Sequence, residues 1–473
     1  MPNLARLVPS TISWLSHRLQ GGVDTARSNP YLEGAFAPVQ DERTETSLRV
    51  TGRIPRDLEG IFTRIGPNPV RTPNPGSYHW FAGDGMVHGL RLHQGMAQWY
   101  RNRWVGADET NKALRRPLLG GPRHGVFDVV NTNVVSHAGR IWATNEGGAM
   151  PAELDEEMNT VGRSFLSSDL SRAFTAHPRQ DPQTGELHAI CYDGGPHRYA
   201  DHVVITKQGD VSRVQRIPLK HAPMIHDCAI TARHVLVLDL PVSFSFGAFL
   251  RGAAMPYRWN PGHEARVGLL PRQGGEASDI IWCSVAPCFV YHVANAYETD
   301  DGRVVLQAVV HDKVFDKQVE RAAERSVTFE EWIIDPDSRS VSRRTLSDES
   351  QEFPRIDESL TGRRHRYVYT VGFKIGGAEG QSVFRYDMTT GHRERHEFGA
   401  ARIPGEAVFV KREGAVDEAE GWLLTYVHDG NTGASDLVIL DAANLDDDPI
   451  ATVHLPWRVP MGFHSTWIDR RLS

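Results

Sequence analysis

The sequence predicts an all-β protein, and three features favour a propeller among the all-β architectures. Short apolar runs of strand length recur, such as Arg140–Thr144, His234–Leu240 and Gly421–Val427. Turn residues separate many of them, as in Asp181–Gly185 and Asp387–Gly391. The pattern continues through most of the 473 residues without a Pro-, Ser- or Gly-rich linker. Sandwiches and barrels also use short strands, but this extent favours small sheets repeated around an axis.

The bulk composition is that of an ordinary globular protein. Hydrophobic residues make up 40% of the chain and charged residues 23%. The net charge is −7 and no basic stripe is interleaved with aromatic residues, so we expect no nucleic acid partner. The four cysteines have no CxxC spacing, which disfavours a zinc ribbon or a dithiol site.

We expect two regions, an N-terminal amphipathic helix and arm over residues 1–28 and a single β-propeller domain over residues 29–473. The helix either docks on the body, which its few basic residues favour, or lies in a membrane interface. No apolar run approaches the ~18 residues of a spanning helix, and no signal-peptide pattern is present. The expected location is therefore the cytoplasm, with peripheral membrane association as the alternative.

Candidate metal ligands are four histidines in apolar, strand-like surroundings. His226 follows Met224 and Ile225 and precedes a buried strand, a setting that holds an imidazole rigidly. The other three candidates are His177, His292 and His464. They lie too far apart for a local metal motif, but separate blades of a propeller can bring such ligands together. Other histidines, such as His311, are expected at the surface or in hydrogen bonds.

The segments around these histidines resemble the four histidine motifs of the carotenoid cleavage oxygenase family. The matching segments are Phe174–Pro178, Met224–Asp227, Val290–Glu298 and Val459–His464. Further matches to the family are Gly60–Pro69, His79–His88 and Glu352–Asp357. So many motifs in the right order make the resemblance specific, and it extends from about Asn29 to the C-terminus. The family includes stilbene-cleaving dioxygenases and the retinoid isomerase of the eye.

The resemblance implies a seven-bladed β-propeller with a helical and loop cap over the metal-bearing face. It implies a non-haem Fe(2+) ion held by His177, His226, His292 and His464. Glu146, Glu352 and Glu406 match the family glutamates that orient the histidines, because a ligating imidazole needs an acceptor for its second N–H. Thr132 matches a position where the family places a small side chain near a vacant iron coordination position.

The family reaction adds both atoms of O2 across a C=C bond of an apolar conjugated alkene and gives two carbonyl products. Stilbenoid-cleaving relatives usually carry a lysine two residues before the first glutamate, where this sequence has Thr144. The expected substrate is therefore a carotenoid or apocarotenoid, with a stilbenoid or phenylpropanoid alkene as the alternative. A non-catalytic binding propeller is disfavoured by the complete histidine set, and a calcium or zinc hydrolase by the absence of a carboxylate ligand.

An apolar cluster within Pro241–Asn260 is expected at the substrate entrance. Phe244, Phe246, Phe249 and Leu250 gather there outside any clear strand pattern. Two interpretations remain open, a long loop folded over its own small core or an exposed patch. The exposed form would allow peripheral contact with a membrane.

Overall fold

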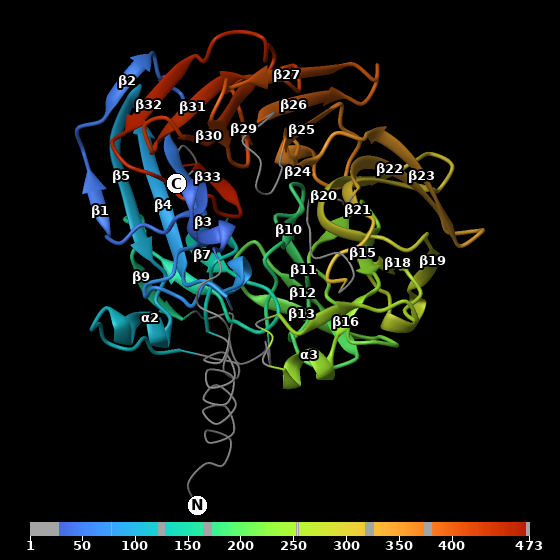
Figure 1. Ribbon diagram of the computed structural model, residues 1–473. Helices are drawn as coiled ribbons and strands as arrows, with labels where there is room; N and C mark the ends of the chain where they lie inside the picture. The colour runs from blue at the N-terminus through green and yellow to red at the C-terminus, as the bar shows by residue number, and fades with distance from the viewer. Residues whose placement is uncertain are drawn as a thin grey trace, which may run out of the picture.

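The fold is all-β and propeller-like, as the sequence predicts (Figure 1). The structure is a computed structural model and describes residues 28–76, 78–121, 128–163, 173–251, 253, 255–316, 326–372 and 381–469. The predicted N-terminal helix and arm lies outside this part, apart from Ser28. Helices in the described part are short: η2 (Pro30–Leu32), η3 (Gly34–Phe36), η4 (Trp80–Ala82), α2 (Asp108–Ala113), α3 (Phe246–Leu250), η5 (Ala277–Asp279) and η7 (Glu358–Leu360).

Three sheets are four-stranded antiparallel meanders. The first contains β6 (Asn133–His137), β7 (Arg140–Thr144), β8 (Ala152–Leu154) and β9 (Thr160–Arg163). The second contains β10 (Arg179–Gln180), β11 (Leu187–Cys191), β12 (Tyr199–Ile205) and β13 (Val211–Pro218). The third contains β24 (Gln351–Arg355), β25 (Tyr367–Gly372), β26 (Ser382–Asp387) and β27 (Arg393–Glu397). Almost all of β24 is buried, whereas β27 exposes alternate residues, as expected for an inner and an outer strand.

The longest sheet has eight strands and consists of two antiparallel meanders. One comprises β14 (Cys228–Ile230), β15 (His234–Asp239), β18 (Arg266–Pro271) and β19 (Ile281–Ser284). The other comprises β20 (Phe289–Glu298), β21 (Val304–His311), β22 (Val327–Asp335) and β23 (Ser340–Ser347). A single parallel pair, Ser284 with Ser340, joins the two meanders. A separate hairpin is formed by β16 (Val242–Phe244) and β17 (Tyr257–Trp259).

Two sheets combine strands from both ends of the chain, which closes the ring. The first contains β1 (Arg43–Glu45), β5 (Met96–Trp104), β4 (Gly85–His93), β3 (Gly60–Pro67) and β33 (Ser465–Asp469). The second contains β2 (Arg49–Gly52), β32 (Ala451–Leu455), β31 (Ala434–Asp441), β30 (Gly421–Asp429), β28 (Arg402–Pro404) and β29 (Val408–Lys411). Arg64 of β3 pairs with Ser465 of β33, so closure places His464 beside the N-terminal strands.

The blade count does not follow from the hydrogen-bonded sheets alone. Six sheets of four or more strands are present in the described part of the chain, because the two meanders containing β14 and β20 share one ladder. End strands of neighbouring meanders contact one another, as β10 contacts β14, β14 contacts β20, β20 contacts β24 and β33 contacts β6. None of the helices in the described part has the length and apolar character needed to cross a bilayer.

Candidate metal centre

The four predicted histidines all lie on or just before innermost strands. His177 precedes β10, His226 precedes β14, and His464 is the residue before β33. His292 lies within β20, where pairing with β21 shifts register on either side of Val293. Such a bulge redirects a side chain without ending the strand, so His292 can point to the centre.

The four imidazoles converge on one point. Nε2 of His226 is 3.2 Å from Nε2 of His177 and 3.2 Å from Nε2 of His292. Nε2 of His292 is 3.1 Å from Nε2 of His464. The four ligand atoms all lie within 4.8 Å of one another, and their side chains are buried or nearly so. The structure thus brings together residues whose sequence positions range from 177 to 464.

Each of the three predicted glutamates hydrogen-bonds one of these histidines. Glu146, which follows β7, lies 2.6 Å from Nδ1 of His226. Glu352 of β24 lies 2.6 Å from Nδ1 of His292. Glu406, between β28 and β29, lies 3.2 Å from Nδ1 of His464. Each of the three glutamates thus contacts a different histidine of the cluster.

These contacts test whether the site fits a metal ion. A carboxylate that accepts from Nδ1–H leaves the lone pair of the neutral imidazole on Nε2, and three such lone pairs face one another across the centre. Lone pairs about 3 Å apart repel unless a cation lies between them. At a metal–nitrogen distance of about 2.1 Å, adjacent ligands of an octahedral ion are about 3.0 Å apart, close to the separations observed. The donor set therefore fits a divalent transition metal.

At Glu406, Glu352 and His464, burial and neighbouring charges favour the protonation states that metal binding requires. Burial opposes ionisation of Glu406, but the charge of Arg355 and the contact with His464 lower its pKa to about 2. Burial likewise opposes ionisation of Glu352, but His292 and His311 hold its pKa well below the ordinary value. Burial lowers the pKa of His464 to about 4, so this imidazole is neutral near pH 7.

His177 is held in place by contacts of its ring with neighbouring histidines and by hydrogen bonds of its own main chain. Its ring centroid lies 4.4 Å from that of His464 and 4.7 Å from that of His226. Its N–H donates to Oγ1 of Thr175 at 3.2 Å, and its carbonyl oxygen accepts from Sγ of Cys228 at 3.6 Å. Burial lowers the pKa of His177 well below the ordinary value, and the neighbouring histidines lower it further.

Three partners of the glutamates had no signal in the sequence. Nε2 of His311 lies 2.7 Å from the second oxygen of Glu352, so one carboxylate serves two imidazoles. The hydroxyl of Tyr192 donates to Glu146 at 2.8 Å, and Arg355 donates to Glu406 at 3.1 Å. Hydrogen bonding was expected for His311, but a link to the metal centre was not. The residues lie tens of positions from their glutamates, so no local pattern could have paired them.

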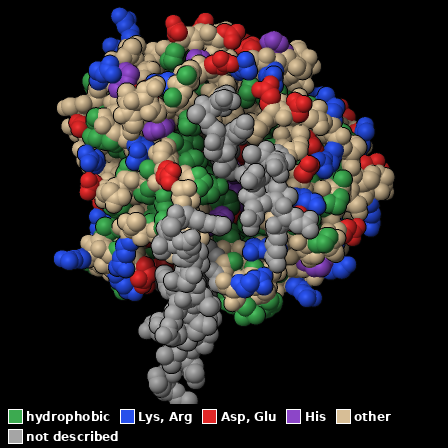
Figure 2. Space-filling model, in the orientation of Figure 1, with side chains coloured by type: hydrophobic (Ala, Val, Ile, Leu, Met, Phe, Trp, Pro, Cys, Tyr) green, Lys and Arg blue, Asp and Glu red, His purple; other side chains and the backbone are tan. Residues whose placement is uncertain are grey.

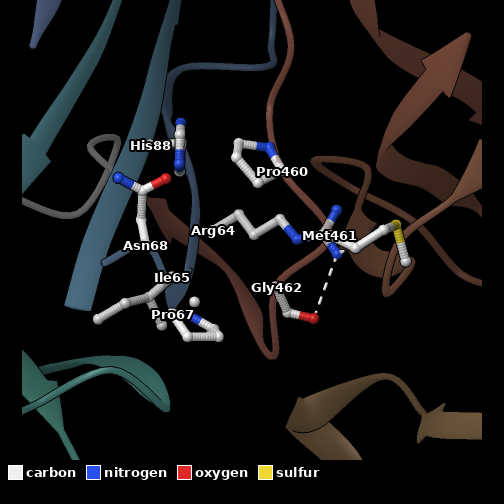
Figure 3. A pocket seen from close by; sticks show the side chains of 9 residues that line it. Arg64, Ile65, Pro67, Asn68, His88, Pro460, Met461 and Gly462 are labelled. Atoms are coloured by element: carbon white, nitrogen blue, oxygen red, sulfur yellow. Dashed lines mark hydrogen bonds between the residues drawn. The ribbon is translucent and has the colours of Figure 1, made fainter. Parts of the chain in front are cut away.

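A buried arginine lies behind the segment that ends at His464. Arg64 of β3 extends between Pro460 and Met461 and donates to the carbonyl oxygen of Gly462 at 3.3 Å (Figure 3). Nη1 of Arg64 also lies close under Gly405, where a Cβ atom would come within 2.3 Å of it. Burial lowers the pKa of Arg64 to about 10, and the charge of Glu406 partly offsets this effect. A side chain at position 405 would therefore require the guanidinium group to shift.

Aromatic side chains surround the histidines. The ring of Phe353 stacks on His292 at a centroid distance of 5.3 Å and meets His464 edge-on at 5.4 Å. Tyr291 lies 5.3 Å from His226, and Phe81 lies 6.3 Å from Tyr291. In the space-filling view, apolar side chains gather around a hollow in the middle of one face, with histidine visible in it (Figure 2). The surroundings of the centre are thus largely apolar.

Thr132 lies beside the main chain of His464. Its carbonyl oxygen accepts from the N–H of His464 at 3.3 Å. Its hydroxyl donates to Asn131 and Asn145. Thr132 therefore contacts the main chain of His464, while its side chain is held by two amides.

The apolar cluster of the predicted entrance is exposed but not irregular. Phe244 ends β16, and the other three members, Phe246, Phe249 and Leu250, lie on α3. Ser245 caps this helix through its hydroxyl and the N–H of Ala248. Phe246 and Leu250 are 62% and 72% exposed, which corresponds to the exposed-patch interpretation.

Sequence comparisons identify the family. The sequence profile of the family described as retinal pigment epithelial membrane protein matches residues 36–469. A carotenoid cleavage oxygenase of Mycobacterium tuberculosis is 38% identical, over 93% of this chain and 97% of that protein. The chain belongs to the carotenoid cleavage oxygenase family. It is therefore an oxygenase of this family, and the resemblance noted in the sequence is confirmed.

Solved structures show the same carotenoid cleavage oxygenase fold. A lignostilbene dioxygenase of Pseudomonas brassicacearum superposes with a TM-score of 0.85 at 26% identity, over 93% of this chain and 98% of that one. A cobalt-substituted apocarotenoid oxygenase of Synechocystis superposes with a TM-score of 0.80 at 25% identity, over 91% and 97%. The second structure contains cobalt, and the four histidines of this chain could hold a metal ion.

Proposed function

We propose that this oxygenase is a non-haem Fe(II) dioxygenase that cleaves a C=C bond of a carotenoid or apocarotenoid with O2 and gives two carbonyl products. The observation that carries the proposal is the convergence of four imidazoles, three of them hydrogen-bonded to carboxylates. His177, His226, His292 and His464 would hold the ion. Fe(II) bound there would supply O2 activation, because ground-state O2 is a triplet that reacts poorly with closed-shell alkenes.

The three glutamates would fix which ring nitrogen of each bonded histidine carries the proton. Glu146, Glu352 and Glu406 each accept from Nδ1 of one histidine, which keeps Nε2 free for the metal. Their charges also offset that of a dication in a dry centre. Thr132, fixed beside His464, would place a small side chain next to a vacant coordination position.

Aromatic side chains would bind and orient the alkene. The rings of Phe81, Tyr291 and Phe353 offer flat apolar faces near the histidines. Such faces pack against a conjugated chain and exclude water from the reacting bond. A polyene needs an apolar path of this kind, whereas a charged substrate would lose hydration there without a partner.

The substrate class rests on similarity and on one residue. The Mycobacterium tuberculosis relative, which is named for carotenoid cleavage, is 38% identical to this chain, whereas the lignostilbene dioxygenase is 26% identical. Thr144 is fully buried, and its hydroxyl lies 3.5 Å from the carbonyl oxygen of Ala176, so it offers no cation to a substrate phenol. A stilbenoid or phenylpropanoid alkene is the second candidate, favoured by the superposition on a lignostilbene dioxygenase.

We further propose that the propeller has seven blades and forms one catalytic domain over residues 29–473. The eight-stranded sheet would count as two blades, because a single residue pair joins its meanders. Seven inner ends of meanders meet at the centre on this count. The cap over the metal-bearing face would include α3 and the β16–β17 hairpin, and residues 1–28 would form the amphipathic arm.

Peripheral membrane contact is proposed for the exposed face of α3. Phe246, Phe249 and Leu250 would dip into a bilayer surface, where a lipophilic substrate dissolves. A cytoplasmic location, with association at the membrane surface, is our expectation from the sequence.

The experiment that tests the function is anaerobic reconstitution with Fe(II), followed by O2 and one of three alkenes. β-Carotene, an apocarotenal and resveratrol are compared, and products are identified by absorbance and mass. Loss of polyene absorbance with paired carbonyl products supports the proposal. Cleavage of resveratrol alone contradicts the substrate assignment, and bound iron without cleavage of any of the three contradicts the proposed activity on these alkene classes.

A further inference from the structure

One ion pair connects three of the four histidines. Arg179 lies two residues after His177, and Asp227 is the residue after His226. Nε and Nη2 of Arg179 donate to the two carboxylate oxygens of Asp227 at 3.3 and 2.5 Å. This bidentate pair joins β10 to the start of β14.

The same pair also binds the residue after His292. Nη2 of Arg179 donates to the carbonyl oxygen of Val293 at 2.8 Å, and the N–H of Val293 donates to Asp227 at 2.8 Å. Both main-chain groups of Val293 are thus bound by side chains from the other two strands. Asp227 also accepts from the N–H of Cys228 at 2.7 Å.

In the described part of the chain, backbone hydrogen bonds do not connect the three strands β10, β14 and β20 to one another. β10 belongs to another sheet, and β14 and β20 stand at opposite ends of theirs, so none of the three pairs with another. The register of β20 with β21 is also irregular on both sides of Val293. The main-chain groups of Val293 are therefore available to the ion pair. Side-chain bonds fix the separation of the three strands where backbone bonds do not.

We propose that Arg179 and Asp227 are positioning residues of the metal centre, which together set the mutual placement of His177, His226 and His292. This inference rests on the proposed function, since it assumes that these histidines bind a metal. Each anchor point lies one or two residues from a histidine. A displacement of any one strand would therefore move an imidazole away from the common point, and metal affinity depends on ligand placement to within about 0.5 Å.

The variants are Asp227→Asn and Arg179→Lys, with Asp239→Asn as the matched control. Asn keeps the shape of Asp227 but replaces one acceptor oxygen with a donor, and Lys cannot form the bidentate fork. The ion pair of Asp239 with Arg266 has side-chain exposures of 1% and 22%, against 1% and 23% for Asp227 and Arg179. It joins β15 to β18 within one sheet.

Each protein, purified and stripped of metal, is titrated with Co(II). The readouts are the Co(II) d–d absorption spectrum, the affinity measured against a chelator, and the melting temperature of the metal-free protein. We expect both Asp227→Asn and Arg179→Lys to weaken Co(II) binding by about 10-fold or more, the range found for residues that orient metal ligands. The spectrum should change as well. Asp239→Asn should lower the melting temperature without changing the affinity or the spectrum.

The outcomes separate this inference from the proposed function. If a folded Asp227→Asn or Arg179→Lys protein retains wild-type affinity and spectrum, the positioning role is wrong. An equal loss of affinity in Asp239→Asn would also overturn it, because the effect would then be one of general stability. If Asp227→Asn does not fold, the milder Arg179→Lys decides. A wild-type protein that does not bind Co(II) overturns the metal centre itself, and the positioning role with it.

Discussion

Nδ1 of His292 lies 2.6 Å from the carboxylate of Glu352. The N–H of Phe353 donates to the same oxygen as His292, and the other oxygen of this carboxylate binds Nε2 of His311 at 2.7 Å. Phe353 adopts a positive φ of 54°, an uncommon conformation for a bulky residue. The local backbone thus departs from regular strand geometry at the point where Glu352 and the ring of Phe353 both meet His292.

Glu352→Gln should weaken metal binding by about 10-fold or more, because the amide carries no charge and accepts at only one oxygen. His311→Ala should weaken it less, since His292 keeps its carboxylate partner. Co(II) titration of the metal-free proteins measures both effects. A larger loss in His311→Ala than in Glu352→Gln would contradict the view that Glu352 acts mainly through His292.

His226→Ala should abolish iron binding and activity while the protein remains folded. Loss of a ligand should exceed the roughly 100-fold upper range for residues that only orient ligands. His365→Ala is the matched control, because His365 is as deeply buried, 6% exposed against 8% for His226, and bonds Asn295 instead. Iron content and circular dichroism measure the two properties. Full iron occupancy in His226→Ala would contradict the four-histidine assignment.

Replacing both Phe246 and Leu250 by serine should reduce binding to phosphatidylcholine vesicles. Full insertion of each apolar side chain contributes about 1.5–3 kcal/mol, so even partial insertion of both should make the double variant bind at least roughly 10-fold more weakly. Val416→Ser is the control, because Val416 is 91% exposed and lies far along the chain from α3. Activity on detergent-dissolved substrate should remain. Unchanged vesicle sedimentation would rule out α3 as the contact surface.

The carboxylate of Glu298 should make the free energy of unfolding depend on pH. Burial opposes its ionisation, but the bonds from His234 and Thr231 lower its pKa to about 2. Because the pKa is lower in the folded state, the ionised carboxylate stabilises the protein at pH values above the ordinary pKa of 4.5. This contribution is lost as the pH falls toward 2.

Glu298→Gln should therefore cost about 1 kcal/mol at pH 7, after screening by solvent. The difference from the wild-type protein should shrink as the pH falls from 5 toward 3. Urea unfolding of the metal-free proteins, followed by tryptophan fluorescence, measures it. A difference that stays constant with pH would show that the ionised carboxylate is not the stabilising species.

The sequence by itself determined the class of the fold and the identity of the candidate ligands. Apolar runs such as His234–Leu240 became strands because alternation, β-branching and turn residues act over a few positions. The motifs around His177, His226, His292 and His464 also marked the four histidines that converge. The sequence left two interpretations of the cluster around α3 open, and it did not indicate the helix that Ser245 caps.

Only the tertiary structure decided how these residues act on one another. His311 joins Glu352, Arg64 lies under Gly405, and Arg179 binds both Asp227 and Val293. The partners lie tens or hundreds of positions apart, so their contacts exist only once the sheets that carry them have packed together. Local sequence patterns record the preferences of neighbouring residues, whereas the meeting of distant side chains depends on how the sheets pack around the centre.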